Sequence, residues 1–415
     1  MLALLQQRFA TYFRTIIGLS RNCHLSYLAA ALSSTARGVF LVVFNLYMLN
    51  MGVSADTLGR VLSVEPFAQA IASIPAGFMA EKIGFRKSLV IIYGLSSLAK
   101  LAQVSTDNLM LISLAALVSG LAFSGDFVVR LPFLAANTTE DQRTYAFTLT
   151  NMIFGICMSL GALFAGQVPN LMLRITPDLT VAYRYTLLLS GAVGLLSVIP
   201  AWLVRDLPTT STRKISLYPY LWGIDVFTKQ QAIVSLLIGI GFGTLTSFAN
   251  VYFVYHLGTT REFFAGVSAV AVIPTTIATS LGPSLAHVLG TVASVTWLRL
   301  LMPVTLVIMA LTRSPIAAAI AYWGDRSMAM TSQPLSFTYA MGSASAKAKG
   351  AVAAWLNTAY WFGNGLAAPI AGFFIARSNY ALPLLLGAAA VLFSGVLNHI
   401  YFRALNDARH GEVQR

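Results

Sequence analysis

Long apolar stretches, separated by short polar connections, run through the whole chain. A helix needs roughly 20 apolar residues to cross a bilayer core of about 30 Å, and stretches of that length recur along the sequence. The pattern therefore predicts twelve membrane-spanning helices. They fall at residues 24–50, 57–79, 87–106, 108–132, 145–168, 184–204, 231–256, 263–287, 292–312, 315–338, 350–376 and 380–403.

Composition strengthens the membrane assignment. Hydrophobic residues make up 57% of the 415 positions and charged residues only 10%, and the mean hydropathy is +0.73. Soluble domains carry about 25% charged residues because their surface faces water. Lipid must therefore cover most of this surface, and we expect an all-α, multi-pass membrane protein. The two cysteines, Cys23 and Cys157, have no metal-site or disulfide spacing, so we expect no metal and no cofactor.

The net charge of +13 could indicate a nucleic-acid partner, but the cations fall mostly between apolar runs. That distribution follows the positive-inside rule and predicts cytoplasmic termini in a cell-membrane protein, with no nucleic-acid partner. The cation-rich set is Arg8, Arg14, Arg21, Lys82, Arg86, Lys87, Arg143, Arg205, Arg213, Lys214, Lys229, Lys347, Lys349, Arg403, Arg409 and Arg415. The opposite connections hold only Arg174, Arg184, Arg261, Arg313 and Arg377, with Arg60 near their edge.

An internal repeat divides the chain. The segment Asn45-Leu46-Tyr47 aligns with Asn250-Val251-Tyr252 at a shift of 205 positions. Three further pairs align at a shift of 206: Gly52 with Gly258, Asn151 with Asn357, and Gly166 with Gly372. Parallel repeats are a transporter architecture. We therefore predict two pseudo-symmetric six-helix bundles, at 1–207 and 231–415, joined by a cytoplasmic linker at 208–230.

The connection after the second span reads Gly77-Phe78-Met79-Ala80-Glu81-Lys82-Ile83-Gly84-Phe85-Arg86-Lys87-Ser88-Leu89. It resembles the pattern G-x-L-A-D-R-x-G-R-K-x-x-L of the major facilitator superfamily, although Phe85 departs from it. The resemblance implies that Gly77, Glu81, Gly84, Arg86 and Lys87 form a conformational latch between the halves. The alternative is a basic loop that only sets topology. The resemblance further implies that spans one, four, seven and ten line a central cavity.

Ionisable side chains at membrane depth cost about 2.5–3.5 kcal/mol on insertion scales, so they are functional candidates. They are Arg37, Glu65, Asp126, Arg130, Asp325 and Arg326, and the polar or aromatic candidates are Asn45, Asn250, Tyr252, Asn357 and Trp361. Three arginines against three carboxylates predict a nearly balanced cavity. Arg37 is expected within reach of Glu65, and Asp126 with Arg130 at i,i+4; either could be a purely structural pair. Lys100 and Arg299 are expected to snorkel to the span ends.

The function expected from these features is secondary active transport of a small organic solute by alternating access. An anionic, zwitterionic or amphiphilic solute suits the expected cavity, and Glu65 or Asp126 is the candidate carrier if protons drive the cycle. We expect a monomer. A drug/proton antiporter is an alternative, although Ala162 stands where that motif has proline. A non-transporting receptor or scaffold is a second alternative, and the absence of catalytic or nucleotide-binding motifs argues against an enzyme or direct ATP driving.

Overall fold

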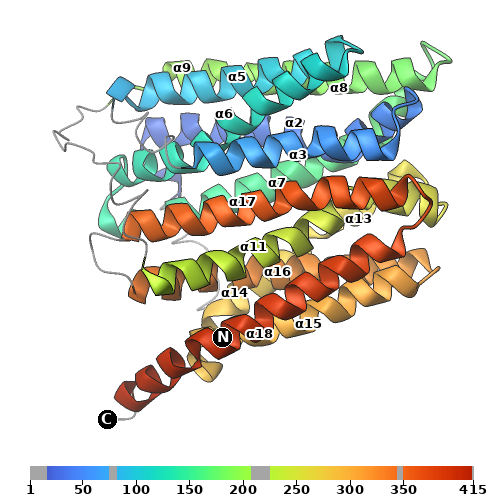
Figure 1. Ribbon diagram of the computed structural model, residues 1–415. Helices are drawn as coiled ribbons and strands as arrows, with labels where there is room; N and C mark the ends of the chain where they lie inside the picture. The colour runs from blue at the N-terminus through green and yellow to red at the C-terminus, as the bar shows by residue number, and fades with distance from the viewer. Residues whose placement is uncertain (1–15, 74–81, 207–224, 344–348, 414–415) are drawn as a thin grey trace, which may run out of the picture.

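A computed structural model describes residues 16–73, 82–206, 225–343 and 349–413, and within them the chain is helical with no strand. The helices run side by side in one general direction (Figure 1). The N-terminal half holds α2 (Arg21–Asn50), α3 (Ala55–Ala72), α5 (Phe85–Ser105), α6 (Leu109–Ala136), α7 (Glu140–Met172), α8 (Leu179–Leu196) and α9 (Val198–Leu203). The C-terminal half holds α11 (Val226–Thr246), α12 (Ala249–Val251), a π-helix (Tyr252–His256), α13 (Arg261–Val270), α14 (Val272–Leu289), α15 (Thr291–Leu311), α16 (Pro315–Ser343), α17 (Lys349–Ile375) and α18 (Ala381–Val413).

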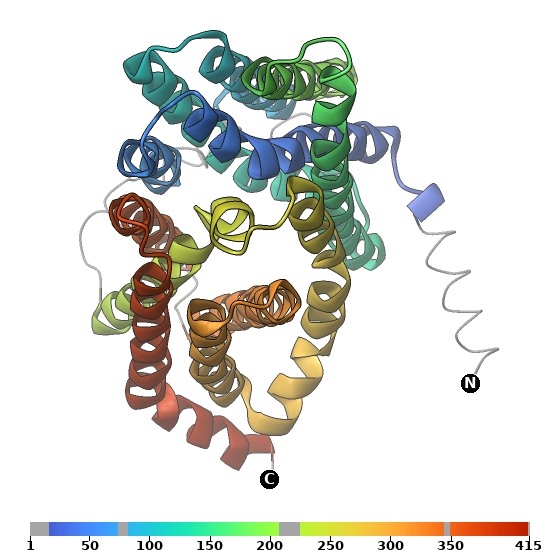
Figure 2. The ribbon, with the colours of Figure 1, turned by 90° about the vertical axis from the view of Figure 1, so that its right-hand side faces the viewer.

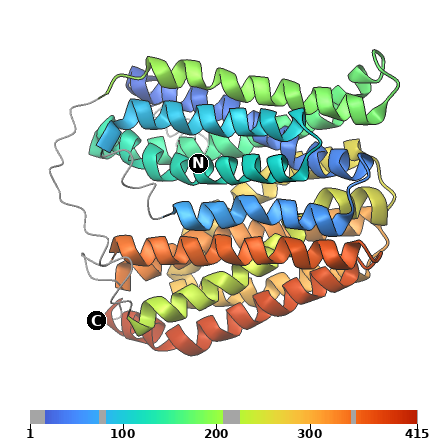
Figure 3. The same ribbon diagram turned by 45° about the horizontal axis from the view of Figure 1, so that its top comes forward.

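Nine helical segments of the described chain are long and apolar enough to cross a membrane. The other predicted spans fall on α3, α16 and α17, and Figure 3 shows the red-orange α17 running along the bundle. The all-α membrane architecture is therefore confirmed, while the count of twelve spans remains a prediction. The predicted linker at 208–230 lies mostly outside the described residues, and α11 begins at Val226, so the bundle boundaries remain a proposal.

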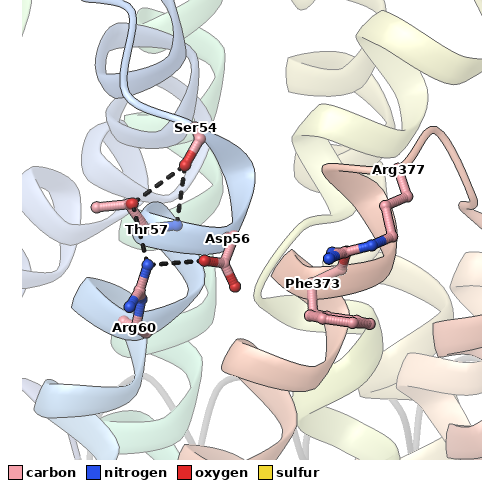
Figure 4. A network of polar contacts seen from close by, with 6 residues as sticks. All are labelled: Ser54, Asp56, Thr57, Arg60, Phe373 and Arg377. Carbon is pink, nitrogen blue, oxygen red and sulfur yellow. Dashed lines mark hydrogen bonds and ion pairs between the residues drawn. The ribbon is translucent and has the colours of Figure 1, made fainter.

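Local sequence signals set the ends of α3 and α17 at the same end of the bundle. The Ser54 hydroxyl accepts the Thr57 backbone N–H at 3.3 Å, which caps α3. One turn later Arg60 pairs with Asp56 at 2.7 Å, and across the gap the Arg377 guanidinium lies 3.6 Å from the Phe373 ring centre at the end of α17 (Figure 4). Both helices thus end in polar groups where the chain leaves the apolar region.

Small residues let the two halves approach closely at two helix crossings. At the crossing of α3 and α17, a Cβ on Gly372 would lie 2.4 Å from the Ala55 carbonyl oxygen, so no larger residue fits. At the crossing of α7 and α13, a Cβ on Gly166 would lie 2.9 Å from the Ala265 Cβ. The repeat shift of 206 maps Gly166 onto Gly372 and Gly59, which also lies at the first crossing, onto Ala265. The predicted repeat therefore reappears as two equivalent contacts between the halves, which Figure 2 shows end-on.

The two ends of the bundle are distinguished by the connections they carry. One end, called the basic end below, carries Arg21, Lys82, Arg86, Arg143 and Lys229. The opposite end carries the turns at 51–54 and 257–260. Of the helices in the other half, α7 packs mainly against α13, near the opposite end, and only marginally against α14, which continues toward the basic end. On this side the halves thus touch near the opposite end and separate along α7 and α14, whereas on the other side α3 stays packed against α17 as far as the Asn357–Ser73 hydrogen bond.

Cysteine labelling tests the predicted orientation. In a background without Cys23 and Cys157, Pro177→Cys at the opposite end should react with a membrane-impermeant maleimide in intact cells. Lys82→Cys at the basic end should react only after permeabilisation, because the basic end is predicted to face the cytoplasm. Both positions are exposed, so poor access cannot explain a difference. The reverse pattern would contradict the predicted orientation.

Candidate functional site

A cavity of about 530 Å³ lies between the two halves. Side chains of α2, α3, α5, α6 and α7 line it from one half, and α11, α16 and α17 line it from the other. Its size falls in the range of about 300–1,000 Å³ typical of small-molecule sites. A second hollow of about 600 Å³ lies near Tyr47 and Arg184, within the N-terminal half at the opposite end. Of these two hollows, the first is lined by both halves, so it is the candidate site.

One carboxylate in the cavity is shared by two cations. Lys100 Nζ lies 2.7 Å from Glu65 Oε2, and Arg37 Nη1 lies 3.4 Å from Glu65 Oε1. The Ser119 hydroxyl also donates to Glu65 Oε1 at 3.4 Å. The side chains are about a fifth exposed, at 21%, 18% and 16% for Arg37, Glu65 and Lys100. The structure thus brings Arg37 and Glu65 together but adds a closer partner.

The expectation that Lys100 snorkels to a span end was wrong. Lys100 lies sixteen residues into α5 and points into the cavity rather than along the helix to its end, because Glu65 and the face of Phe40, 5.0 Å away, hold its ammonium group. Lys100 therefore joins Arg37 and Arg326 as a cavity-lining cation, and among the described lining residues Glu65 is the only carboxylate. The cavity carries a formal charge of +2 and not the near balance predicted from sequence.

Asp126 and Arg130 lie behind the cavity wall. They form the expected i,i+4 pair, with Arg130 Nη2 3.1 Å from Asp126 Oδ2. The Tyr93 hydroxyl donates to Asp126 Oδ1 at 2.9 Å. Both charged residues are buried, at 7% and 0% exposure, and neither lines the cavity. Their contacts lie within the N-terminal half, which is what a structural pair requires.

Arg326 of α16 lines the cavity, whereas its neighbour Asp325 does not. The Arg326 guanidinium lies 4.9 Å from the ring centre of Phe242 and 5.9 Å from that of Tyr322. Asp325 is 1% exposed on another face of α16. Its polar neighbour is Thr305, but that hydroxyl donates to the Met302 carbonyl, so neither carboxylate oxygen accepts a hydrogen bond from a described residue. Of these two adjacent candidates, only Arg326 therefore lines the cavity.

Aromatic rings form a continuous path across the cavity from Arg37 to Arg326. The Arg37 guanidinium lies 3.5 Å from the ring centre of Phe123, which meets Trp361 of the other half at 6.5 Å. Trp361 contacts Tyr360 at 5.2 Å, and Tyr360 contacts Phe242 at 5.8 Å. Phe242 in turn lies under Arg326. Trp361 and its neighbour Tyr360 were predicted as possible substrate contacts, while Phe123 and Phe242 were not.

Asn45 and Asn250, equivalent in the repeat, meet at the interface of the halves. Asn45 Nδ2 donates to Asn250 Oδ1 at 2.9 Å and to the Ser247 carbonyl at 2.7 Å. Asn250 Nδ2 donates to the Val42 carbonyl at 2.8 Å. The predicted span at 231–256 is interrupted here. The helix α11 ends at Thr246, and the Ser247 carbonyl accepts the hydrogen bond from Asn45. These bonds are called the asparagine bridge below.

The remaining polar candidates differ in position. Asn357 lines the cavity and donates to the Ser73 hydroxyl of the other half at 2.9 Å. Tyr252 does not line it, since its hydroxyl donates to the Met309 carbonyl within the C-terminal half.

Two polar cavity residues were not predicted from the sequence: Gln69, one turn from Glu65, and Gln103, one turn from Lys100. Each is at least 97% buried and has an amide atom without a hydrogen-bond partner among the described residues. Their helical spacing from Glu65 and Lys100 was the sequence signal that could have placed them on the same helix faces as these charged residues.

Arg299 was also expected to snorkel, and this expectation was wrong. It is 2% exposed, and Nη1 donates to the Ser394 hydroxyl at 3.5 Å. The close packing of α15 against α18 keeps the side chain inside the C-terminal half. Arg299 does not line the cavity.

Comparisons with known proteins identify the family. The Major Facilitator Superfamily model matches residues 26–368. The chain belongs to the Major Facilitator Superfamily. A curated relative, the uncharacterized MFS-type transporter YhjO of Bacillus subtilis (strain 168), is 23% identical over 136 residues, and this match spans 33% of each chain. The chain therefore matches about a third of that relative's length.

Solved structures share the superfamily fold. The nucleoside transporter NupG superposes with a TM-score of 0.73 at 13% identity, covering 92% of this chain and 99% of that one. A bacterial homologue of the human lysosomal transporter Spinster, in an inward-facing and occupied conformation, gives a TM-score of 0.71 at 17% identity, covering 92% and 96%. These likenesses support the fold and, with the family, a multi-pass membrane protein of a transporter superfamily.

The superfamily loop after the second span is only partly described. Gly77 and Glu81 lie outside the described residues. Gly84 has φ +84° next to the Asp206 carboxylate, and the Arg86 backbone N–H donates to Asp206 Oδ1 at 2.8 Å. The Arg86 guanidinium lies 4.6 Å from the Trp202 ring centre, and Lys87 is exposed. These contacts tie the loop to the end of α9 in its own half, with Asp206 as an anion at the N-terminus of α5. The latch between halves remains a prediction.

Because Arg37 and Lys100 share the Glu65 carboxylate, variants of these three residues should differ in stability in a fixed order. Glu65→Gln leaves Arg37 and Lys100 facing each other, and partial exposure reduces the cost of such an uncompensated charge to about 2 kcal/mol. Arg37→Met or Lys100→Met each leaves one cation paired with Glu65, so both should cost less. Thermal unfolding of the purified variants measures this. A loss for Glu65→Gln no larger than for either cation variant would contradict the shared-carboxylate arrangement.

Proposed function

We propose that this chain is a secondary active transporter that moves a small organic solute across the cell membrane by alternating access, as a monomer with cytoplasmic termini. The observation that carries the proposal is the cavity lined by both halves, with the asparagine bridge between the halves at α2 and α11–α12. Midplane sites between repeats are typical of such transporters. Structural neighbours that are transporters add support. At 13–17% identity their fold does not carry their substrates over to this chain.

The contacts that close the opposite end suit a reversible closure. They include the neutral hydrogen bonds of the asparagine bridge and a small exposed cluster in which Asn170 donates to Glu262 at 3.0 Å and Arg261 donates to Asn170 and Tyr183. A neutral hydrogen bond contributes only about 0.5–1.5 kcal/mol net. Binding of a solute could therefore offset their loss and let the halves separate at this end. A state closed at the basic end completes the cycle.

Proton coupling, if present, would use Glu65. It is the only carboxylate among the described cavity-lining residues, whereas Asp126 lies behind the wall with Tyr93 and Arg130. A drug/proton antiporter is the alternative function. The cavity charge disfavours it for cationic drugs, since three cations face one carboxylate.

Labelling from both membrane faces tests alternating access without a known substrate. Met330→Cys, in the cavity wall, should react with an impermeant maleimide added from either face of oriented vesicles. Joining Asn170→Cys to Glu262→Cys with a short bifunctional thiol reagent should abolish labelling from the opposite-end face only. The reason is that these positions belong to different halves and touch at that end. Reduction of a cleavable reagent should restore the labelling.

The matched control joins two positions of one half at the same end. Asn50 Nδ2 donates to the Thr180 hydroxyl at 2.7 Å within the N-terminal half. Cross-linking Asn50→Cys to Thr180→Cys should leave labelling from both faces unchanged. Labelling of Met330→Cys from one face alone, before any cross-linking, would contradict transport and favour the receptor or scaffold alternative.

A further inference from the structure

We propose that the cavity binds an organic anion with a flat apolar body, and that Arg326 holds its anionic group. This inference rests on the proposed function, because it names the solute that the central cavity would carry. It follows from three features of the described cavity: its charge, the environment of Arg326, and its aromatic path.

The charge of the cavity selects the sign of the ligand. Arg37 and Lys100 share Glu65, so that corner keeps one positive charge. Arg326 contributes a second one. A charge at membrane depth that lacks an opposite charge is costly, and an anionic ligand would relieve that cost. A cationic ligand would increase it.

Arg326 is the cation that is free to hold the anion. Its guanidinium forms no ion pair with any carboxylate in the described part of the chain, and its contacts are the faces of Phe242 and Tyr322. A guanidinium stacked on rings keeps its N–H donors in the plane, where they can bind a carboxylate in a bidentate fashion. Arg37, by contrast, already lies between Glu65 and Phe123. The anionic group is therefore expected at Arg326.

The aromatic path predicts the shape of the rest of the ligand. Phe242, Tyr360, Trp361 and Phe123 follow one another across the cavity from Arg326. Rings favour offset or edge contacts with another flat apolar group. Gln69 and Gln103 also line the cavity, at its far corner beside Glu65 and Lys100.

Three probes of one shape and different charge test the inference. Isothermal titration calorimetry of the purified protein should show that naphthoate binds, while naphthamide and naphthylmethylammonium bind at least about tenfold more weakly. Arg326→Gln should weaken naphthoate about ten- to a hundredfold and leave naphthamide unchanged, because only the carboxylate loses its partner. Arg326→Lys should keep part of the affinity. Trp361→Leu should weaken naphthoate and naphthamide alike, because both use the ring face.

Arg313→Gln is the matched control, since it removes the same charge from an exposed residue of the C-terminal half outside the cavity. Equal naphthoate affinity in Arg313→Gln and Arg326→Gln would overturn the assignment of Arg326. Tighter binding of the neutral or cationic probe, or no binding of any probe, would overturn the ligand class. Both results are measured on the unmutated protein, so they do not depend on whether a variant folds. Vesicle labelling of Met330→Cys is independent of these probes. If Met330→Cys is labelled from both faces but naphthoate does not bind, only this inference is contradicted. If naphthoate binds but Met330→Cys is labelled from one face alone, the proposed transport function is contradicted.

Discussion

A charged or polar side chain at membrane depth must find its partner within the protein, because lipid supplies none. This constraint accounts for the arrangement around the cavity. Glu65 lies between Arg37 and Lys100, and Asp126 lies between Tyr93 and Arg130. The asparagine bridge meets the same need with neutral groups. Two adjacent residues are exceptions: Arg326 faces the cavity with aromatic rings in place of a carboxylate, and the buried Asp325 accepts no hydrogen bond from a described residue.

Close helix crossings make the shared cavity possible. Gly372 and Gly166 bring the halves close together at two positions that the repeat relates. Tight packing supplies stabilisation through many small dispersion contacts. The hydrogen bonds across the interface are few and mostly neutral. An interface of this kind can be cohesive and still allow the halves to rock about the cavity.

Much of the fold follows from sequence, because apolar length and the repeat are one-dimensional signals. The depth of Arg37 and Glu65 along their spans was enough to expect their contact. Depth alone failed for Lys100, because the face of a helix that points inward depends on the neighbouring helices. The same limit explains Asp126 and Asp325, which lie at the expected depth but on faces turned away from the cavity. The repeat equated Asn45 with Asn250, yet their contact depends on both lying at the interface.

The central claim is that the halves move as units about a cation-rich cavity. Distance measurements between spin labels in proteoliposomes test it directly. One label pair sits at Pro177 and Arg313 at the opposite end, and the other at Arg143 and Val288 at the basic end; all four positions are exposed and each pair joins the two halves. The account predicts two distance populations at each end, with longer distances at one end accompanying shorter distances at the other when conditions shift the balance. A single, unchanging distance at both ends, with and without naphthoate, would contradict it.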